Sequence, residues 1–324
     1  MKVLGPLAAL VAVLFAASVL IGPAGVGPGL SITALFSDHG ALTLVMREIR
    51  LPRATLALLV GASLGLSGAA MQAFLRNPLA EPGLIGVSSS AALGAVIALQ
   101  TGIAASFALA LPAAALAGAG VSVALIFLLA GPGGGSLGLI LSGVAISALT
   151  AALTALVLNL SPNPFAASEI VFWMMGSLTD RSWLHVWVAA PFMLAGAALL
   201  WGTGRGLDAL TLGEDAAQSL GIDLRRLRLR VIVGVAAMVG AATAVAGAIG
   251  FVGLVVPHLL RRATGAQPSR LLSASALGGA ALVLAADIAV RVILPARDLK
   301  LGVLMALIGA PVLLRLIWQY RRMP

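Results

Sequence analysis

Long apolar stretches recur along this chain and constrain its fold more than any other feature. Each stretch approaches the length of about 20 residues that an α-helix needs to cross a membrane. Hydrophobic residues make up 60% of the 324 residues and charged residues only 10%, whereas soluble domains carry about 25% charged residues. The apolar runs are continuous rather than alternating, which argues against a membrane β-barrel. The sequence therefore predicts an all-α polytopic membrane protein, with about ten transmembrane helices in a single domain over residues 1–324.

The expected spans follow from the apolar runs and the polar turns between them. They cover approximately residues 3–21, 54–74, 87 onward, 108–130, 137–159, 185–202, 231–248, 246–262, 271–294 and 301–318. We interpret the first as a helix rather than a cleaved signal peptide, because a single lysine precedes a long apolar run and no clear cleavage site follows. Residues 24–49 are polar enough to form an external loop.

One run, residues 246–262, combines apolar character with helix-breaking residues. Gly247, Gly250 and Gly253 are followed by Pro257, and in a helix interior glycine costs about 1 kcal/mol and proline about 3. Such breaks survive in membranes where neighbouring helices or a water-filled path satisfy the freed backbone groups. The run predicts a tightly packed, interrupted membrane segment beside a pathway, although plain packing explains these residues equally well.

Several chemistries are excluded by residue types. The chain has no cysteine, so it has no disulfide, thiolate metal site or cysteine nucleophile. A P-loop needs a lysine after a glycine-rich loop, and neither Lys2 nor Lys300 follows one, so this sequence contains no P-loop. If ATP drives this protein, another subunit must bind it. The histidines, His39, His185 and His258, lack metal-ligand spacing. We expect no metal site and no catalysis.

The longest polar insert covers about residues 205–230. Glu214 and Asp215 open a short stretch with helical spacing, Gly221 is a C-terminal stop signal, and a basic segment follows. An ordinary cytoplasmic loop explains the arginines but not an amphipathic helix before them. We therefore expect one short helix followed by a basic one.

The basic residues also indicate the orientation of the chain. With ten spans and an inner N-terminus, the inner segments hold Lys2, Arg76, Arg205, Arg225, Arg226, Arg228, Arg230, Arg261, Arg262, Arg270, Arg315, Arg321 and Arg322. The outer segments hold Arg47, Arg50, Arg53, Arg181, Arg291, Arg297 and Lys300. This excess predicts that both termini are cytoplasmic. The positive-inside pattern also explains the net charge of +9 without a nucleic-acid partner.

Asp287 and Arg291 lie four residues apart, on one face of the ninth span. An intramembrane carboxylate is a candidate for ion coupling, but the nearby arginine favours a structural ion pair. The arginines of Arg50-Leu-Pro-Arg53, just before the second span, are equally well explained as ordinary interfacial anchors.

Six motifs stand in order along the chain: Arg50-Leu-Pro-Arg53, Ser67-Gly-Ala-Ala-Met-Gln72, Asn77-Pro-Leu-Ala-Glu-Pro-Gly83, Phe172-Trp-Met-Met-Gly-Ser177, Leu212-Gly-Glu-Asp-Ala-Ala-Gln-Ser-Leu-Gly221 and Gly247-Ala-Ile-Gly-Phe-Val-Gly-Leu-Val-Val-Pro-His258. With these motifs the chain resembles the FecCD/BtuC-type permeases, the membrane subunits of bacterial importers for iron siderophores, haem and vitamin B12. The resemblance covers essentially the whole chain. It implies a type II ABC importer in the inner membrane.

The resemblance also implies partners and roles. A second copy of the chain would complete a central path, two separate ABC ATPase subunits would bind ATP and magnesium, and a periplasmic binding protein would dock outside. Binding-protein docking would fall to Arg50, Arg53 and Arg291. Coupling to the ATPases would fall to Gly213, Glu214, Asp215, Ala217, Leu220, Gly221, Arg225 and Arg226. The path and gate would involve Ser136, Trp173, Met174, Met175, Gly250, Gly253 and Pro257, with the fifth and tenth spans and a helix over Phe172–Ser177.

The resemblance is incomplete in the turn over residues 131–136, which is glycine-rich where relatives carry polar and basic residues.

From the resemblance as a whole we expect ATP-driven import of a metal chelate, with a ferric siderophore favoured over haem or cobalamin. An ion-coupled secondary transporter is a more remote alternative.

Overall fold

The computed structural model describes residues 3–22, 26–37, 40–131, 135–161, 164–293 and 299–320. In these ranges the regular structure is entirely helical. The α-helices are α1 (Leu4–Leu20), α2 (Pro28–Phe36), α3 (Ala41–Leu44), α4 (Leu51–Phe74), α5 (Val87–Gln100), α6 (Ala110–Ala130), α7 (Ser136–Asn159), α8 (Pro164–Met174), α9 (Trp183–Trp201), α10 (Gly204–Leu210), α11 (Glu214–Ser219), α12 (Leu224–Ala246), α13 (Val252–Arg261), α14 (Pro268–Ile293) and α15 (Leu301–Tyr320). A π-helix, η1 (Val45–Arg50), and two 3₁₀ turns, η2 (Pro82–Ile85) and η3 (Ile103–Ala105), complete the described elements.

The expected spans correspond to helices of this fold. Six described helical segments are long and apolar enough to cross a membrane: Ala41–Phe74, Ala110–Ala130, Leu137–Asn159, Trp183–Trp201, Leu224–Ala246 and Pro268–Ile293. Four shorter apolar helical segments, Leu4–Leu20, Val87–Gln100, Val252–Arg261 and Leu301–Leu316, match the remaining expected spans. The predicted all-α polytopic membrane fold is confirmed.

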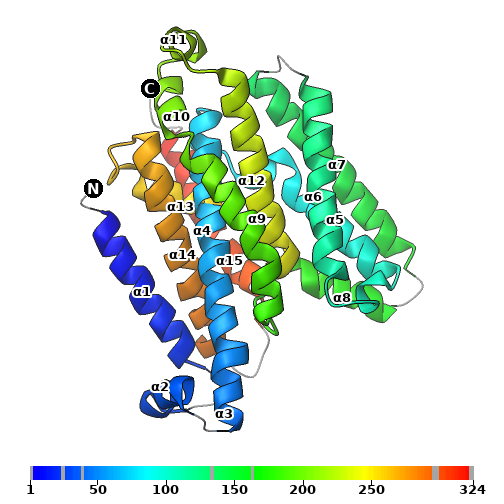
Figure 1. The fold of residues 1–324 in the computed structure, drawn as a ribbon. Helices are drawn as coiled ribbons and strands as arrows, with labels where there is room; N and C mark the ends of the chain where they lie inside the picture. The colour runs from blue at the N-terminus through cyan, green and yellow to red at the C-terminus, as the bar shows by residue number, and fades with distance from the viewer. Residues whose placement is uncertain are drawn as a thin grey trace.

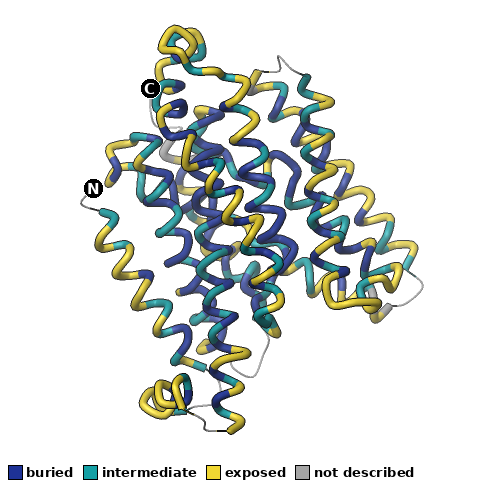
Figure 2. The backbone as a smooth tube through the Cα atoms, in the orientation of Figure 1, coloured by how far each residue is buried: buried dark blue, intermediate teal, exposed yellow. Residues whose placement is uncertain are grey.

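Helices α4, α12 and α14 form the centre of the molecule (Figure 1). Helix α4 packs against α14, α12 and α13, while α12 also contacts α6 and α9. Helix α1 lies on the outside of α14, and α5 to α7 form the opposite flank (Figure 1). Figure 2 shows burial concentrated in the central helices and exposure on α1 and α7, whose outer faces are apolar.

Glycine permits the close approach of α4 and α14. A Cβ atom added to Gly61 would overlap the backbone of Gly279, and one added to Gly65 would overlap the carbonyl of Ser275. Small residues at four-residue spacing let helix backbones approach this closely in membranes. Gly61 and Gly65 therefore form a close-packing pattern between α4 and α14.

The segment before α4 is more helical than expected. Residues 24–49 contain α2, α3 and most of η1, and the helical segment continues from Ala41 to Phe74. The second span was expected to begin just after Arg50-Leu-Pro-Arg53, and this boundary is wrong, because the helical segment begins at Ala41. Pro52 cannot donate an amide hydrogen bond. The π-helical turn over Val45–Arg50, whose hydrogen bonds span one more residue than in an α-helix, precedes it, and the helix continues through Pro52.

Two further helix boundaries differ from expectation. The helix expected over Phe172–Ser177 instead occupies Pro164–Met174, and Gly176, with a φ of +73°, follows its end. The basic segment after the polar insert is not a separate helix, because α12 begins at Leu224 and continues into the membrane span.

Candidate functional site

A buried ionic cluster joins α4 and α14 at one end of the molecule. Asp287 is fully buried, and its carboxylate accepts hydrogen bonds from Nε and Nη2 of Arg53 at 3.0 and 2.8 Å. Arg291 approaches the other carboxylate oxygen at 2.9 Å. The ion pair expected between Asp287 and Arg291 is thus present, and Arg53 makes it a triad.

Two arginines of this cluster also hold the end of α1. Arg291 donates to the carbonyls of Ser18 and Ile21, both at 2.9 Å. Arg50 donates to the carbonyl of Leu20 at 2.8 Å. The last carbonyls of a helix lack partners within the helix and carry partial negative charge, so the two guanidinium groups satisfy and stabilise the C-terminus of α1.

The structure therefore brings together the three arginines for which docking was predicted. Arg50 and Arg291 are buried, and the side chain of Arg53 is 15% exposed. With one carboxylate for three guanidinium groups, the four side chains carry a formal charge of +2. This excess favours the approach of an acidic surface, and docking by these arginines stays a prediction.

At the opposite end of the molecule, α11 projects beyond the other helices (Figure 1). Glycines with positive φ flank it, Gly213 at +108° and Gly221 at +82°, and the C-terminal stop predicted at Gly221 is present. Ala217 is fully buried, whereas Leu212 and Leu220 are 69% and 63% exposed. Large exposed apolar side chains on either side of a projecting helix are typical of a protein-docking surface.

The acidic and basic coupling residues lie around this helix. Glu214 and Asp215 occupy its first turn, and Arg225 and Arg226 are exposed in the first turn of α12. Arg226 forms a solvent-exposed ion pair with Asp223 at 3.0 Å. The residues predicted to couple to the ATPases therefore share one end of the molecule, and this role stays a prediction.

Asp208 connects this region to α14 and was missed by the sequence interpretation. Its carboxylate accepts hydrogen bonds from the backbone nitrogen and hydroxyl of Ser269, at 2.8 and 2.7 Å, and from the side chain of Gln267 at 3.0 Å. The Asp208 side chain thereby caps the N-terminus of α14 from a neighbouring element. The sequence contained one signal for this role. Asp208 is one of only 11 acidic residues, and it lies near two glycines in the polar insert.

The predicted interruption in the eighth span is present. Helix α12 ends at Ala246, and α13 begins at Val252 after Phe251, a non-glycine residue with a φ of +67°. The carboxylate of Glu81 accepts a hydrogen bond from the Phe251 amide at 2.6 Å. Burial raises the pKa of Glu81, which lies in the turn between α4 and α5, beside a cavity of about 200 Å³.

The glycines of the interruption have different surroundings. At Gly247, with a φ of +71°, a Cβ would overlap the carbonyl of Trp173, and at Gly253 it would lie 2.6 Å from Cδ of Pro82. At Gly250 the nearest atom is an oxygen of Glu81 at 3.6 Å, an ordinary contact. Gly247 and Gly253 therefore carry the close packing, while Gly250 borders open space.

Pro257 creates a defect in α13 that another helix compensates. Because proline has no amide hydrogen, the carbonyl of Gly253 loses its partner within the helix. The buried side chain of Gln72 donates to this carbonyl at 3.2 Å and to that of Leu254 at 3.3 Å. Arg261 donates to the side-chain oxygen of Gln72, so a polar chain from α4 supports the helix around its proline.

Comparison with known proteins now identifies the family. The FecCD transport family matches residues 10–319 of the chain. The chain belongs to the FecCD transport family.

Three relatives share this assignment. The FecCD chain is 39% identical over 308 residues to the hemin transport system permease HmuU of Yersinia pestis, covering 93% of this chain and 92% of that one. It is 40% identical over 276 residues to the cobalamin import system permease BtuC of Halobacterium salinarum, covering 84% and 73%. It is 40% identical over 267 residues to the Fe(3+) dicitrate transport system permease FecD of Escherichia coli, covering 82% and 83%.

A solved structure shares the whole fold. It is reported as an inward-facing conformation of a transporter assigned to the metal-chelate type of ABC transporters. The match covers 98% of this chain and 99% of that one, at 33% identity and a TM-score of 0.87. The FecCD chain is therefore a membrane-spanning permease of the type II ABC importer class.

The remaining predicted path residues of this FecCD permease lie in separate places. Trp173 and Met174 are half-buried at the end of α8, and Met175 is 38% exposed just beyond it. Ser136 begins α7, but its side chain is outside the described part of the structure. Of the predicted basic residues, Lys2, Arg297, Arg321 and Arg322 also lie outside the described residues. Their roles stay predictions.

Proposed function

We propose that this FecCD permease is the membrane subunit of an ATP-driven importer that moves a metal chelate from the periplasm to the cytoplasm by alternating access. The observation that carries the proposal is the placement of two different surfaces at opposite ends of one bundle. The projecting helix α11 lies at one end, and the cationic cluster around Asp287 lies at the other.

The end with α11 suits the ATPase subunits. The exposed Leu212 and Leu220 supply apolar contacts, and Glu214, Arg225 and Arg226 supply charges around them. In this proposal the partner subunits bind ATP and magnesium, and this chain holds neither. A second copy of the chain completes the path.

The opposite end suits a periplasmic binding protein. The uncompensated positive charge of the cluster attracts carboxylates, and guanidinium groups bind carboxylates in a bidentate fork. Arg53, the most exposed of the three arginines, is the first contact in this proposal. Helix α1 begins and α15 ends toward the α11 end (Figure 1), which supports cytoplasmic termini in a bacterial inner membrane.

Movement between these surfaces has a direct route through α14. Its N-terminus is capped by Asp208, which lies in α10 beside α11. Its other end carries Asp287 and Arg291, which bind α4 and α1. In this proposal ATP binding shifts the α10–α11 region and biases the bundle between pre-existing inward- and outward-open states.

A ferric siderophore is the cargo we propose, with haem and cobalamin as alternatives. The relatives named above divide among ferric dicitrate, haem and cobalamin transport. The ion-coupled secondary transporter is less favoured, because the carboxylate of Asp287 is paired with both Arg53 and Arg291, which is the geometry of a structural ion pair.

The test is reconstitution in vesicles with the ABC ATPase and the periplasmic binding protein of the same importer. Uptake of radiolabelled ferric siderophore, haem and cobalamin is compared with and without internal ATP. We expect ATP-dependent uptake of one chelate that is insensitive to a protonophore and absent with the permease alone. Uptake by the permease in ATP-free vesicles would refute the proposal.

Two substitutions separate the proposed surfaces. Glu214→Arg at α11 should uncouple ATP hydrolysis from uptake while leaving the helical spans folded, as judged by circular dichroism. Arg53→Gln should weaken association with the binding protein, whereas Arg47→Gln, an exposed arginine at the same end, should change it little. Equal effects of the two arginine substitutions would remove Arg53 from the docking surface.

A further inference from the structure

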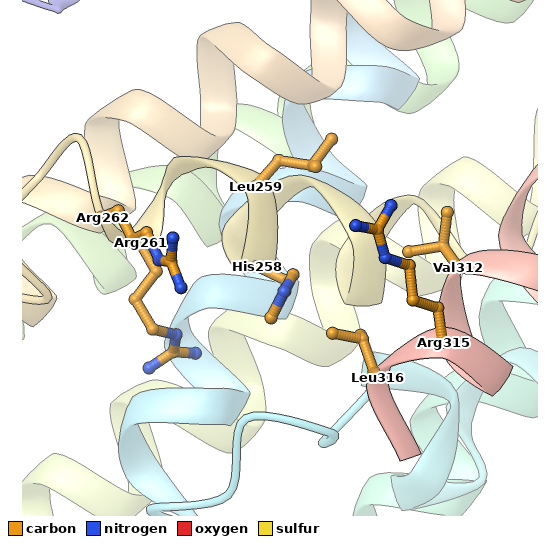
Figure 3. Close-up of a pocket in the computed structure, with 7 residues that line it drawn as sticks. All are labelled: His258, Leu259, Arg261, Arg262, Val312, Arg315 and Leu316. Carbon is orange, nitrogen blue, oxygen red and sulfur yellow. The ribbon is translucent and has the colours of Figure 1, made fainter. Parts of the chain in front are cut away.

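A basic cavity lies between α13 and α15, and its lining residues belong to neither of the two surfaces described above. Its volume is about 390 Å³. Arg261 and Arg262 line it from the end of α13, and Arg315 lines it from α15. In Figure 3, His258 lies between the two arginines of α13 and Arg315. Two helices distant in sequence thus place three guanidinium groups and one imidazole around a single hollow.

The positive charge of this cavity is not compensated by a lining carboxylate in the described residues. The sequence has no aspartate or glutamate between residues 252 and 286, or from residue 301 to its end. Arg262 and Arg315 take part in none of the ion pairs found in the described part of the chain. An unbalanced group of guanidinium side chains at a cavity favours an anionic ligand.

One side of the cavity is already ordered. Arg261 donates to the side-chain oxygen of Gln72, which in turn supports the backbone of α13. This contact fixes the position of the Arg261 side chain before any ligand arrives, so less conformational entropy is lost on binding.

Apolar side chains adjoin the charged ones. Leu259, which is 65% exposed, and Val312 line the cavity with the buried Leu316. Both helices belong to the apolar segments of a multi-pass membrane protein. A ligand that suits this lining has an anionic head and an apolar body. Basic pockets between transmembrane helices bind lipid headgroups in this way.

We propose that this cavity binds the phosphate of an anionic phospholipid headgroup. The guanidinium groups of Arg262 and Arg315 contact the phosphate oxygens from opposite sides, and the acyl chains lie along Leu259 and Val312. The chemistry recognised is a phosphate ester in a headgroup without a cation to neutralise it, which excludes zwitterionic phosphatidylcholine. Inorganic phosphate is the competing source of the same anion.

The test measures binding of dioleoyl phosphatidylglycerol and dioleoyl phosphatidylcholine to the detergent-purified full chain by native mass spectrometry. The test variant is Arg262→Gln with Arg315→Gln. Its matched control is Arg228→Gln with Arg230→Gln, which removes the same charge from α12, outside the cavity. We expect the phosphatidylglycerol Kd to rise on the order of thirtyfold in the test variant, at about 1 kcal/mol per arginine.

A second measurement on the wild-type chain does not depend on the folding of a variant. Phenylglyoxal modifies accessible arginines, and peptide mass spectrometry reads each site. Phosphatidylglycerol vesicles should protect Arg262 and Arg315 from modification, while phosphatidylcholine vesicles and inorganic phosphate should not.

The outcomes separate the possible ligands. Protection by inorganic phosphate equal to that by phosphatidylglycerol would assign the cavity to a small anion and overturn the lipid proposal. Equal binding of the two lipids would show apolar association without recognition of an anionic headgroup, and would overturn the proposal. An equal loss in both arginine double variants would show only general attraction to positive charge, and would overturn it as well. Protection that requires the ATPase subunit would assign the arginines to a protein interface instead.

Discussion

Replacing Asp287 with asparagine tests whether the ionic cluster holds the bundle together. The change keeps the size of the side chain but removes the single negative charge between Arg53 and Arg291. Asp287 is fully buried and binds these arginines at 2.8 and 2.9 Å. A hydrogen bond to a charged group contributes about 1.5–3 kcal/mol, so two of them amount to about 3–6. This agrees with the cost of about 3–5 kcal/mol for removing one partner of a buried pair.

The assay is thermal unfolding of the purified protein in detergent, followed by intrinsic fluorescence. A loss of this size should lower the apparent Tm by on the order of 10 °C. The matched control is Asp223→Asn, which weakens an ion pair at 3.0 Å whose side chains are 80% and 49% exposed. An exposed pair contributes about 0–1 kcal/mol, and asparagine still caps α12, so the control should differ little from wild type.

A double variant tests the reasoning further. Arg53→Gln added to Asp287→Asn removes one of the two cations that Asp287 had compensated, so its effect should be smaller than the sum of the single effects. Equal Tm values for Asp287→Asn and Asp223→Asn, or strict additivity in the double variant, would refute a stabilising role for the cluster.

Three further predictions concern the interruption before α13. Gly253→Ala should destabilise the protein by about 1–3 kcal/mol, because the added Cβ would lie 2.6 Å from Cδ of Pro82. At Gly250 the added Cβ would lie 3.6 Å from the nearest atom, an oxygen of Glu81, so Gly250→Ala should cost about 0.5 kcal/mol or less in the same Tm assay. Gln72→Leu should cost about 1–3 kcal/mol by leaving the Gly253 carbonyl unpaired, and hydrogen exchange should increase in α13; unchanged exchange would contradict this. Because burial raises the pKa of Glu81 above its ordinary 4.5, its charged form opposes folding, so Tm should fall as pH rises through the raised pKa. Glu81→Gln should flatten that part of the pH profile, and an unaltered profile would exclude Glu81 as its source.

The apolar segments could be predicted because a bilayer requires their length and composition. Each helical span satisfies its own backbone, so its existence is encoded locally. The same local logic identified the short helix before Gly221 and the interruption after Gly247. It failed at Pro52, where the π-helical turn keeps a helix continuous through a residue that ordinarily starts one.

The polar network was not predictable, because its partners are far apart in sequence. Glu81 meets Phe251 across 170 positions, and Gln72 meets Arg261 across 189. Nothing local to Gln72 shows that a proline in another helix has left a carbonyl without a donor. Arg50, Arg53 and Arg291 were predicted to act together. Their burial and their contacts with α1 could not be predicted, because both depend on how three helices pack.

Helix α14 also has the geometry of a lever. Its 26 residues span about 39 Å, and its described length contains no proline after the first position. A rotation of about 5° about the end held by Asp208 would displace the far end by about 3 Å, several times the tolerance of a hydrogen bond. The bonds from Arg291 to α1 must then either move that helix too or break. A small angular input at the α11 end would thereby reach the other end either as a shift of α1 or as the loss of its contacts with Arg291.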